Sequence, residues 1–170
     1  MAQPPPSFKA QPRKPRLTLP PGACDTHFHV WAPQGVFPFA PDRPYTPPCD
    51  APKETLFAMH RHIGVQRGVV VQSAPYGFDN SAAADLIAAK PRQYRGIALL
   101  RASGSTAELE RLNAQGFRGV RFHYMDHLGA GDPIDAVLAM APRLAEIGWH
   151  LQIHMAGARI AELTPALKRS

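Results

Sequence analysis

The sequence predicts an α/β fold in which five strands alternate with helices. Short runs rich in β-branched and aromatic residues recur along the chain, and each is followed by a segment with helical spacing of apolar residues. Runs such as residues 68–72 are continuously apolar, which is typical of strands buried on both faces. Strands that alternate with helices pair in parallel through right-handed crossovers, so the pattern predicts a parallel sheet or barrel.

The first predicted strand covers about residues 23–30, and a stretch rich in proline and aromatic residues, 31–52, follows as a long loop. A helix is predicted at 53–63, because its apolar residues lie on one face and Gly64 provides a stop. The remaining predicted strands cover residues 68–72, 94–100, 119–124 and 149–155. The remaining predicted helices cover residues 80–90, 106–114 and 134–147, with a last one starting near Arg159.

Two regions differ in composition. Residues 1–20 contain several prolines and basic residues, which predicts a flexible leader, and residues 21–170 are predicted to form one domain. The 170 residues carry a formal net charge of +6, but no long basic run alternates with aromatic residues. We therefore expect a small anionic organic substrate and no nucleic acid.

The cysteine count and the hydropathy pattern bear on where the protein works. Cys24 and Cys49 form no C-x-x-C pair, which favours a reducing compartment over a disulfide scaffold. The sequence lacks an apolar run long enough to span a membrane and an apolar signal core at its start. A soluble cytoplasmic protein with no membrane partner is expected.

His27 and His29 form an H-x-H motif at the end of the first predicted strand. Side chains two residues apart in a strand point to the same face, so the two imidazoles are expected to converge. Converging imidazoles suit a metal ion or an anionic substrate group, whereas the alternative is a surface strand whose histidines meet only water. The position at a strand end, before a long loop, favours a functional site.

The H-x-H motif is one of an ordered set of motifs that resembles the amidohydrolase superfamily, and within it the amidohydrolase-related group that includes the pyrone-dicarboxylate lactonases. The set consists of Asp25-Thr26-His27-Phe28-His29 and the Pro-rich stretches 37–41, 45–48 and 50–52. The resemblance implies a TIM (β/α)8 barrel, which typically needs about 250 residues. The chain is therefore expected to contain an incomplete barrel with the first five β-α units. The sixth-strand histidine and eighth-strand aspartate used by such enzymes are absent from this stretch.

The resemblance also implies roles for individual residues. His27, His29 and His154 would be catalytic, and His27 and His29 would bind a divalent metal, Zn or Mn, as in most of the superfamily, or no metal if the protein is lactonase-like. Tyr45, Ser73 and Asn80 would contact substrate. The alternatives are a surface aromatic for Tyr45, turn or cap residues for Ser73 and Asn80, and a core histidine for His154.

Arg121 is the charged residue most strongly expected to bind substrate. A guanidinium within an apolar strand is costly to bury unless it meets an anion, and its fork matches a carboxylate; the alternative is a structural salt bridge. His127 takes the place where the lactonases have a second arginine, so it is a candidate substrate contact that favours a neutral or monoanionic lactone. Asp25 is expected to face the same way as His27 and to orient an imidazole; the alternative is a turn or edge residue. The helical residues 60–62 are expected to be solvated surface.

The function predicted is a hydrolase that acts on a lactone or related cyclic ester or amide bearing a carboxylate, by attack of water on the carbonyl. This stretch alone is expected to be inactive. One alternative is a metal-dependent decarboxylase of an aromatic acid on the same fold. Another is a non-catalytic half-barrel that needs a partner, through self-association or a complementing chain, because its edge strands would lack neighbours.

Overall fold

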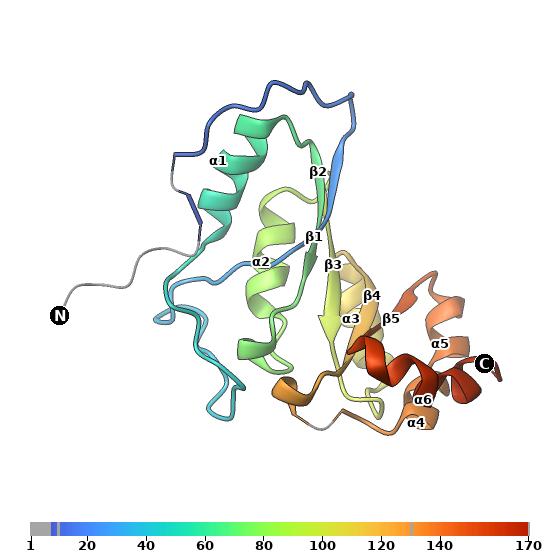
Figure 1. The fold of residues 1–170 in the computed structure, drawn as a ribbon. Helices are drawn as coiled ribbons and strands as arrows, with labels where there is room; N and C mark the ends of the chain where they lie inside the picture. Colours follow the sequence, from blue (N-terminus) through green and yellow to red (C-terminus); the bar gives the residue numbers. More distant parts are fainter. Residues whose placement is uncertain (1–7, 10, 130, 170) are drawn as a thin grey trace.

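The computed structural model describes residues 8–9, 11–129 and 131–169. One sheet contains β1 (Cys24–Phe28), β2 (Arg67–Val71), β3 (Tyr94–Leu99), β4 (Phe117–Tyr124) and β5 (His150–Met155), which pair in parallel in this order. The helices are α1 (Lys53–Ile63), α2 (Ser81–Ala89), α3 (Thr106–Ala114), α4 (Ile134–Leu138), α5 (Ala141–Glu146) and α6 (Ile160–Leu167). The sheet turns progressively from β1 to β5 (Figure 1) and forms a curled half-barrel. The predicted β-α alternation and parallel sheet are confirmed.

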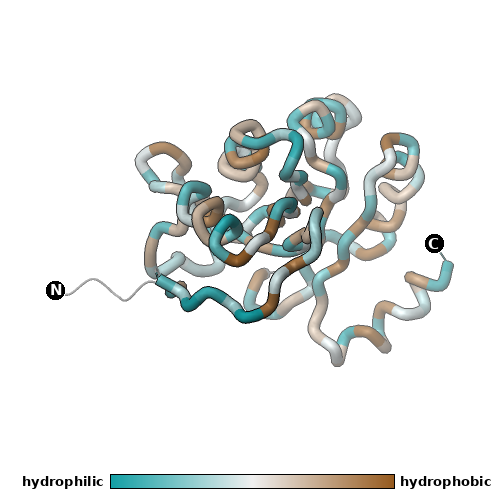
Figure 2. The backbone as a smooth tube through the Cα atoms, turned by 90° about the horizontal axis from the view of Figure 1, so that it is seen from above, coloured by the Kyte–Doolittle hydropathy of each residue, from teal (hydrophilic) through white to brown (hydrophobic). Residues whose placement is uncertain are grey.

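The apolar core lies between the sheet and its helices. In β4, Val120, Phe122 and Tyr124 point to this side, where they join residues of the helices such as Leu86 and Leu112 in one buried cluster. Figure 2 shows apolar and hydrophilic residues interspersed along the chain. Arg121 and His123, which alternate with the core residues of β4, therefore face the inside of the curl.

Local signals set the ends of two helices. The helix α1 ends at Gly64, whose positive φ of 87° is a left-handed conformation and whose N–H donates to the His60 carbonyl at 2.9 Å. In front of α3, the Ser105 hydroxyl accepts a hydrogen bond from the Glu108 N–H at 3.1 Å. The bounds of both helices agree with the prediction.

The predicted helix over residues 134–147 is wrong as a single element, because α4 ends at Leu138 and α5 begins at Ala141. Pro142 lies in the first turn of α5. Proline has no N–H to donate to the carbonyl four residues earlier, and its ring would collide with that carbonyl in a continuous helix. The first strand is also shorter than predicted, and the described part of the leader, residues 8–9 and 11–20, contains neither helix nor strand. The rest of the leader lies outside the described residues.

A bulge in β1 changes which side chains share a face. Asp25 pairs with Gly68 and Phe28 with Val70, so three steps along β1 match two steps along β2. Phe28 packs against His60 and Tyr94 on the helix side of the sheet, and Asp25 contacts His60 as well. The prediction that Asp25 faces the same way as His27 is therefore wrong, because the extra residue breaks the alternation.

The long loop after β1 is closed at its base. Trp31 and Ala51 exchange two backbone hydrogen bonds of 2.9 and 2.7 Å, and Phe39 packs with Tyr76 in a small core of the loop. The Tyr76 hydroxyl accepts the Ala32 N–H at 2.7 Å, which attaches the loop to the segment after β2. Among the described residues, none of the helices is long and apolar enough to cross a membrane.

Candidate active site

The carboxyl ends of the strands surround a cavity of about 120 Å³. Its lining contains a tyrosine, an arginine, four histidines and three further residues: His29, Tyr45, Gln72, Ala74, Arg121, His123, His127, Leu128 and His154. A neighbouring cavity of about 260 Å³ is also lined by Arg121 and His123. Because all strands are parallel, their carboxyl ends meet at one rim, and this is where a barrel gathers its functional side chains.

Arg121 is the charged group of this cavity. Its side chain comes from the middle of β4 and only 7 % of the residue is exposed. No carboxylate lies within ion-pair distance of it in the part of the chain that the structure describes, and its Nη1 donates a hydrogen bond of 3.4 Å to Nε2 of His27. The alternative of a structural salt bridge thus finds no partner here, and a buried cation without an anion favours an anionic ligand.

His27 and His29 lie beside this guanidinium. Their ring centroids are 5.3 Å apart with the planes at 88°. His29 Nδ1 donates to the Val71 carbonyl at 2.8 Å, which leaves Nε2 as the nitrogen available to a ligand. Burial lowers the pKa of both imidazoles, and the charge of Arg121 lowers each pKa further, so both rings are neutral at pH 7.

His123 and His154 form a second histidine pair. They lie opposite each other on β4 and β5, and their Nδ1 atoms are 3.0 Å apart. Burial lowers the pKa of His123 to about 4, and the nearby Arg121 charge acts in the same direction. The pKa of His154 is lowered by the same two causes. The site therefore combines one fixed cation with a set of neutral imidazoles.

Tyr45 and His127 reach the cavity from outside the sheet. Tyr45 belongs to the long loop and is 40 % exposed, and His127 lies in a short 3-10 turn after β4. Both line the same cavity as Arg121. The structure thus brings five residues of the predicted site to one cavity: His29, Tyr45, Arg121, His127 and His154. His27 lies beside this cavity and is hydrogen-bonded to Arg121.

Ser73 and Asn80 are buried, but their side chains bond to other parts of the protein. The Ser73 hydroxyl accepts the Trp31 indole N–H at 3.0 Å, which ties the long loop to the segment after β2. The Asn80 amide donates to the carbonyls of Phe78 and Leu99, each at 3.0 Å, and accepts the Leu99 N–H at 3.0 Å. These bonds fix the start of α2 against β3, so the structure does not bring Asn80 into the lining of the cavity.

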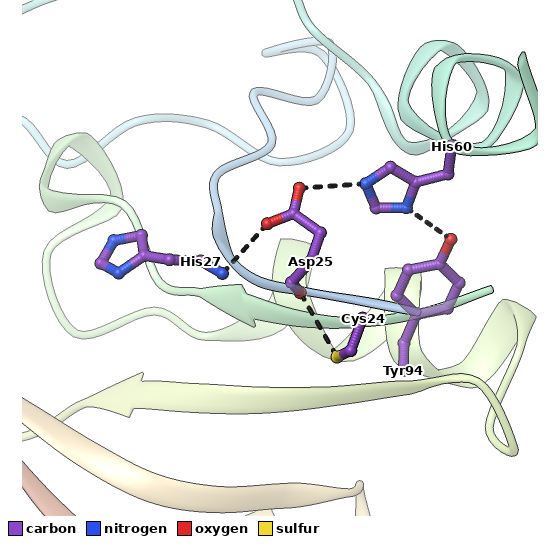
Figure 3. Close-up of polar contacts among 5 residues, drawn as sticks. All are labelled: Cys24, Asp25, His27, His60 and Tyr94. Atoms are coloured by element: carbon purple, nitrogen blue, oxygen red, sulfur yellow. Dashed lines mark hydrogen bonds and ion pairs between the residues drawn. The ribbon is translucent and has the colours of Figure 1, made fainter. Parts of the chain in front are cut away.

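A buried chain of hydrogen bonds below the site was missed by the sequence reasoning (Figure 3). Tyr94 and His60 Nδ1 are 2.9 Å apart, His60 Nε2 lies 3.2 Å from Asp25 Oδ2, and the other oxygen of Asp25 accepts the His27 N–H at 3.2 Å. The prediction of a solvated His60 is wrong, because only 1 % of it is exposed. The sequence did contain a signal for this burial: His60 follows the apolar Leu56 by four residues and so lies on the same face of α1.

The chain of bonds supports the strand that carries the site. Because the Asp25 carboxylate can only accept, His60 Nε2 carries the proton and His60 Nδ1 accepts from the Tyr94 hydroxyl. Burial lowers the pKa of His60, which keeps this ring neutral. Asp25 therefore holds His60 and the His27 backbone in place, and through them the β1 bulge. The hydrogen bonds of its carboxylate to described residues include neither imidazole of the H-x-H motif.

The sequence profile of the amidohydrolase family matches residues 24–169. The chain belongs to the amidohydrolase family. It is 44 % identical over 154 residues to 2-pyrone-4,6-dicarboxylate hydrolase of Comamonas testosteroni, with 91 % of this chain and 50 % of that protein covered. It is 39 % identical over 142 residues to 4-sulfomuconolactone hydrolase of Rhizobium radiobacter, with 82 % and 47 % covered.

A solved structure supports the barrel assignment of this amidohydrolase. A crystal structure of a Pseudomonas putida protein superimposes with a TM-score of 0.72 at 32 % identity, covering 89 % of this chain and 55 % of that one. The chain thus spans about half the length of the curated relatives it matches. The half-barrel of five β-α units agrees with the predicted incomplete TIM barrel.

Membership of the amidohydrolase family raises the question of a divalent metal at His27 and His29. No three His, Cys, Asp or Glu side chains are arranged to hold an ion within the described ranges. Arg121 Nη1 also lies 3.4 Å from His27 Nε2, and the guanidinium charge opposes a cation at that nitrogen. The described residues of this stretch therefore do not fit a metal at His27 and His29.

Proposed function

We propose that this chain supplies the ligand-binding part of a hydrolase that opens a lactone bearing a carboxylate. The buried Arg121 carries the proposal, because its guanidinium faces a cavity and has no carboxylate partner among the described residues. A planar fork of N–H donors binds a carboxylate by two parallel hydrogen bonds. The relatives named as hydrolases of a pyrone dicarboxylate and a sulfomuconolactone support this class of substrate.

The neutral histidines suit the carbonyl chemistry of such a substrate. An imidazole N–H aimed at the carbonyl oxygen stabilises the negative charge that develops there when water attacks. His27 and His29 lie close enough to Arg121 for one ligand to contact all three residues. Arg121 would hold the carboxylate. His27 Nε2 accepts from Arg121, so the proton of this ring lies on Nδ1, and that N–H would donate to the reacting carbonyl. The unprotonated Nε2 of His29 would instead accept a hydrogen bond from water, because its Nδ1 donates to Val71.

Catalysis by the whole protein would draw on further groups. β1 and β5 are the edges of the sheet, and each has a strand neighbour on one side within the described part of the chain. We propose that further strands pair with these edges, either from a longer chain or from a second polypeptide, and that they bring additional catalytic side chains. Exposed strand edges are ready to accept such pairing.

Calorimetric titration tests the binding part of this proposal. We expect the chain to bind 2-pyrone-4,6-dicarboxylate and to bind its uncharged dimethyl ester at least about tenfold more weakly, because the ester offers no anion to Arg121. Arg121→Ala should remove this preference, whereas Arg61→Ala, at an exposed position of α1, should retain it. Equal affinity for acid and ester in the unmodified chain would contradict the proposal.

Activity requires a separate measurement. Ring opening of the same dicarboxylate is followed by chromatography, with the 170-residue chain alone and with the C-terminal half of the Comamonas testosteroni relative added as a separate polypeptide. Hydrolysis that appears only when both are present would support a complementing chain. Release of carbon dioxide in place of ring opening would contradict the assignment as a hydrolase.

A further inference from the structure

The cavity of about 260 Å³ is lined by three arginines: Arg43, Arg101 and Arg121. Arg43 uses its donors within its own loop, because Nε donates to the Thr46 hydroxyl at 2.8 Å and Nη1 to the Ala40 carbonyl at 3.1 Å. Arg101 makes one ion pair with a described residue, and the 3.6 Å from its Nη1 to Asp132 Oδ1 is too long for a hydrogen bond. Its guanidinium therefore keeps N–H donors available to a ligand.

Arg101 lies at the mouth of this cavity, and Arg121 lies deeper. Leu99 at the end of β3 pairs with Arg121 of β4, and both residues line the cavity. Arg101 follows Leu99 by two residues, so it lies up to roughly 7 Å further out, because a strand rises about 3.3 Å per residue. The exposure agrees with this order, since 59 % of the Arg101 side chain is exposed but only 7 % of Arg121.

The neighbours of Arg101 hold it at this rim. Its carbonyl accepts the Gly104 N–H at 2.9 Å, and the N–H of the following Ala102 donates to Asp132 Oδ2 at 2.6 Å. The guanidinium carbon lies 4.4 Å from the centroid of the Phe78 ring. Because Phe78 and Asp132 both line the cavity, the guanidinium that contacts them lies at its wall. Stacking on a ring face leaves the N–H groups at the guanidinium edge free to bind an anion.

The charges around this cavity favour an anion, although two carboxylates also line it, those of Asp42 and Asp132. Three arginines face these two aspartates, and Asp132 is engaged by the Ala102 N–H. The lining histidine, His123, adds no charge at pH 7, because burial lowers its pKa to about 4. A second acidic group on a ligand held by Arg121 would therefore be attracted to the mouth of the cavity.

We propose that Arg101 binds a second acidic group of the ligand that Arg121 anchors, so that the site selects dianions over monoanions. The inference rests on the proposed function and specifies its substrate class. His127 stands where the lactonases that the sequence resembles have a second arginine, which led to the expectation of a neutral or monoanionic lactone. Arg101 supplies a second cation from the segment after β3, and its planar fork matches a carboxylate.

Calorimetric titration of the 170-residue chain with one diacid and two monoacids tests this inference. The ligands are 2-pyrone-4,6-dicarboxylate, 2-pyrone-4-carboxylate and 2-pyrone-6-carboxylate, which share one ring. We expect the diacid to bind about fivefold more tightly than the better of the two monoacids, which is the upper end of what an exposed ion pair supplies. Equal affinities for the diacid and the better monoacid would overturn the inference.

Two matched substitutions assign this preference to one side chain. Arg101→Gln should lower the affinity for the diacid to that of the better monoacid and leave both monoacid affinities unchanged. Arg92→Gln removes the same charge at an exposed position before β3, at the opposite end of the strand, and should retain the preference. An equal loss in both variants would show an effect of net charge and would count against Arg101. Thermal unfolding checks that each variant is folded.

The outcomes separate this inference from the function on which it rests. If the unmodified chain binds none of the ligands, both fail. If it prefers the diacid to its dimethyl ester through Arg121 but does not distinguish the diacid from the better monoacid, only the role of Arg101 fails. In the Arg121→Ala variant, Arg101→Gln should have no further effect, because the contact at the rim requires a ligand anchored below it. A further loss there would mean that the two arginines do not hold one ligand.

Discussion

Arg121 of β4 lies against His27 of β1, with 3.4 Å between Nη1 and Nε2. These strands are not neighbours, because β2 and β3 lie between them in the sheet. Strands in a flat sheet are spaced by about 4.8 Å, so side chains three strands apart would lie roughly 14 Å from each other. The contact is therefore a consequence of the curl of the sheet, which brings side chains distant in the sequence to one cavity.

Replacing Arg121 should raise stability while it removes anion binding. Arg121→Met keeps the length and apolar stem of the side chain but removes a buried charge without a carboxylate partner among the described residues. We expect the free energy of unfolding to rise by about 1 kcal/mol or more, since an unpaired buried charge is destabilising. Urea unfolding and dicarboxylate titration measure the two effects. A less stable variant would show that Arg121 has a structural partner.

The stability of the protein should fall as the pH drops below about 6.5. The pKa values of five imidazoles are lowered in the folded chain, chiefly by burial: His27, His29, His60, His123 and His154. The unfolded chain therefore binds protons more readily, so the free energy of unfolding falls as the pH drops below the unfolded pKa towards the lowered pKa values of the folded chain. The buried His60 and the partly buried His123 should contribute most of this loss, and the exposed His27 and His29 less. Urea unfolding at pH 7.5, 6.5 and 5.5 checks this. A constant free energy over this range would contradict it.

Tyr94→Phe should destabilise the chain without touching the cavity. The change removes the hydroxyl that donates to His60 Nδ1 and leaves a buried nitrogen without a partner, at a cost of about 1–3 kcal/mol. The amide signal of His27 should also shift, because Asp25 joins His60 to the His27 N–H. Tyr45→Phe, at a 40 % exposed position, should leave the unfolding midpoint unchanged. Equal midpoints for both variants would argue against the hydrogen-bond chain.

Gly96→Ala should weaken the packing of β3 against its neighbours. A Cβ at this position would lie 2.6 Å from Cδ1 of Phe117 and 2.8 Å from Cδ1 of Ile87, so both buried side chains would have to move. We expect a loss of about 1–3 kcal/mol in the free energy of unfolding. Gly157→Ala is the control, because a Cβ there meets nothing within 4 Å. A neutral Gly96→Ala would mean that the core at β3 can expand.

The predictable features depended on local signals. The bounds of α1 and α3 follow from a glycine stop and a serine cap, which act within a few residues. The five strands were recognisable as apolar runs, and Arg121 stood out as a charge inside one of them. The break before Pro142 was also visible in the sequence, but the apolar spacing on both sides of it favoured one helix.

The unpredicted features depended on pairing between distant segments. The bulge in β1 exists only relative to β2, so alternation within the strand could not reveal that Asp25 turns towards His60. The contact of His123 with His154 depends on the register of β4 and β5. The sequence placed both histidines near the ends of their strands, but the pattern along one strand does not by itself say which residue of the next strand lies opposite, so the pair was not recognised.

The separation of the two faces of the sheet also bears on how this protein can evolve. The apolar core lies on the helix side, whereas Arg121, His123 and His154 project to the other side of the same strands. Substitutions at the inner positions can therefore accumulate without repacking the core. After duplication of such a gene, a few substitutions on the inner face can change the substrate while the core between sheet and helices stays the same.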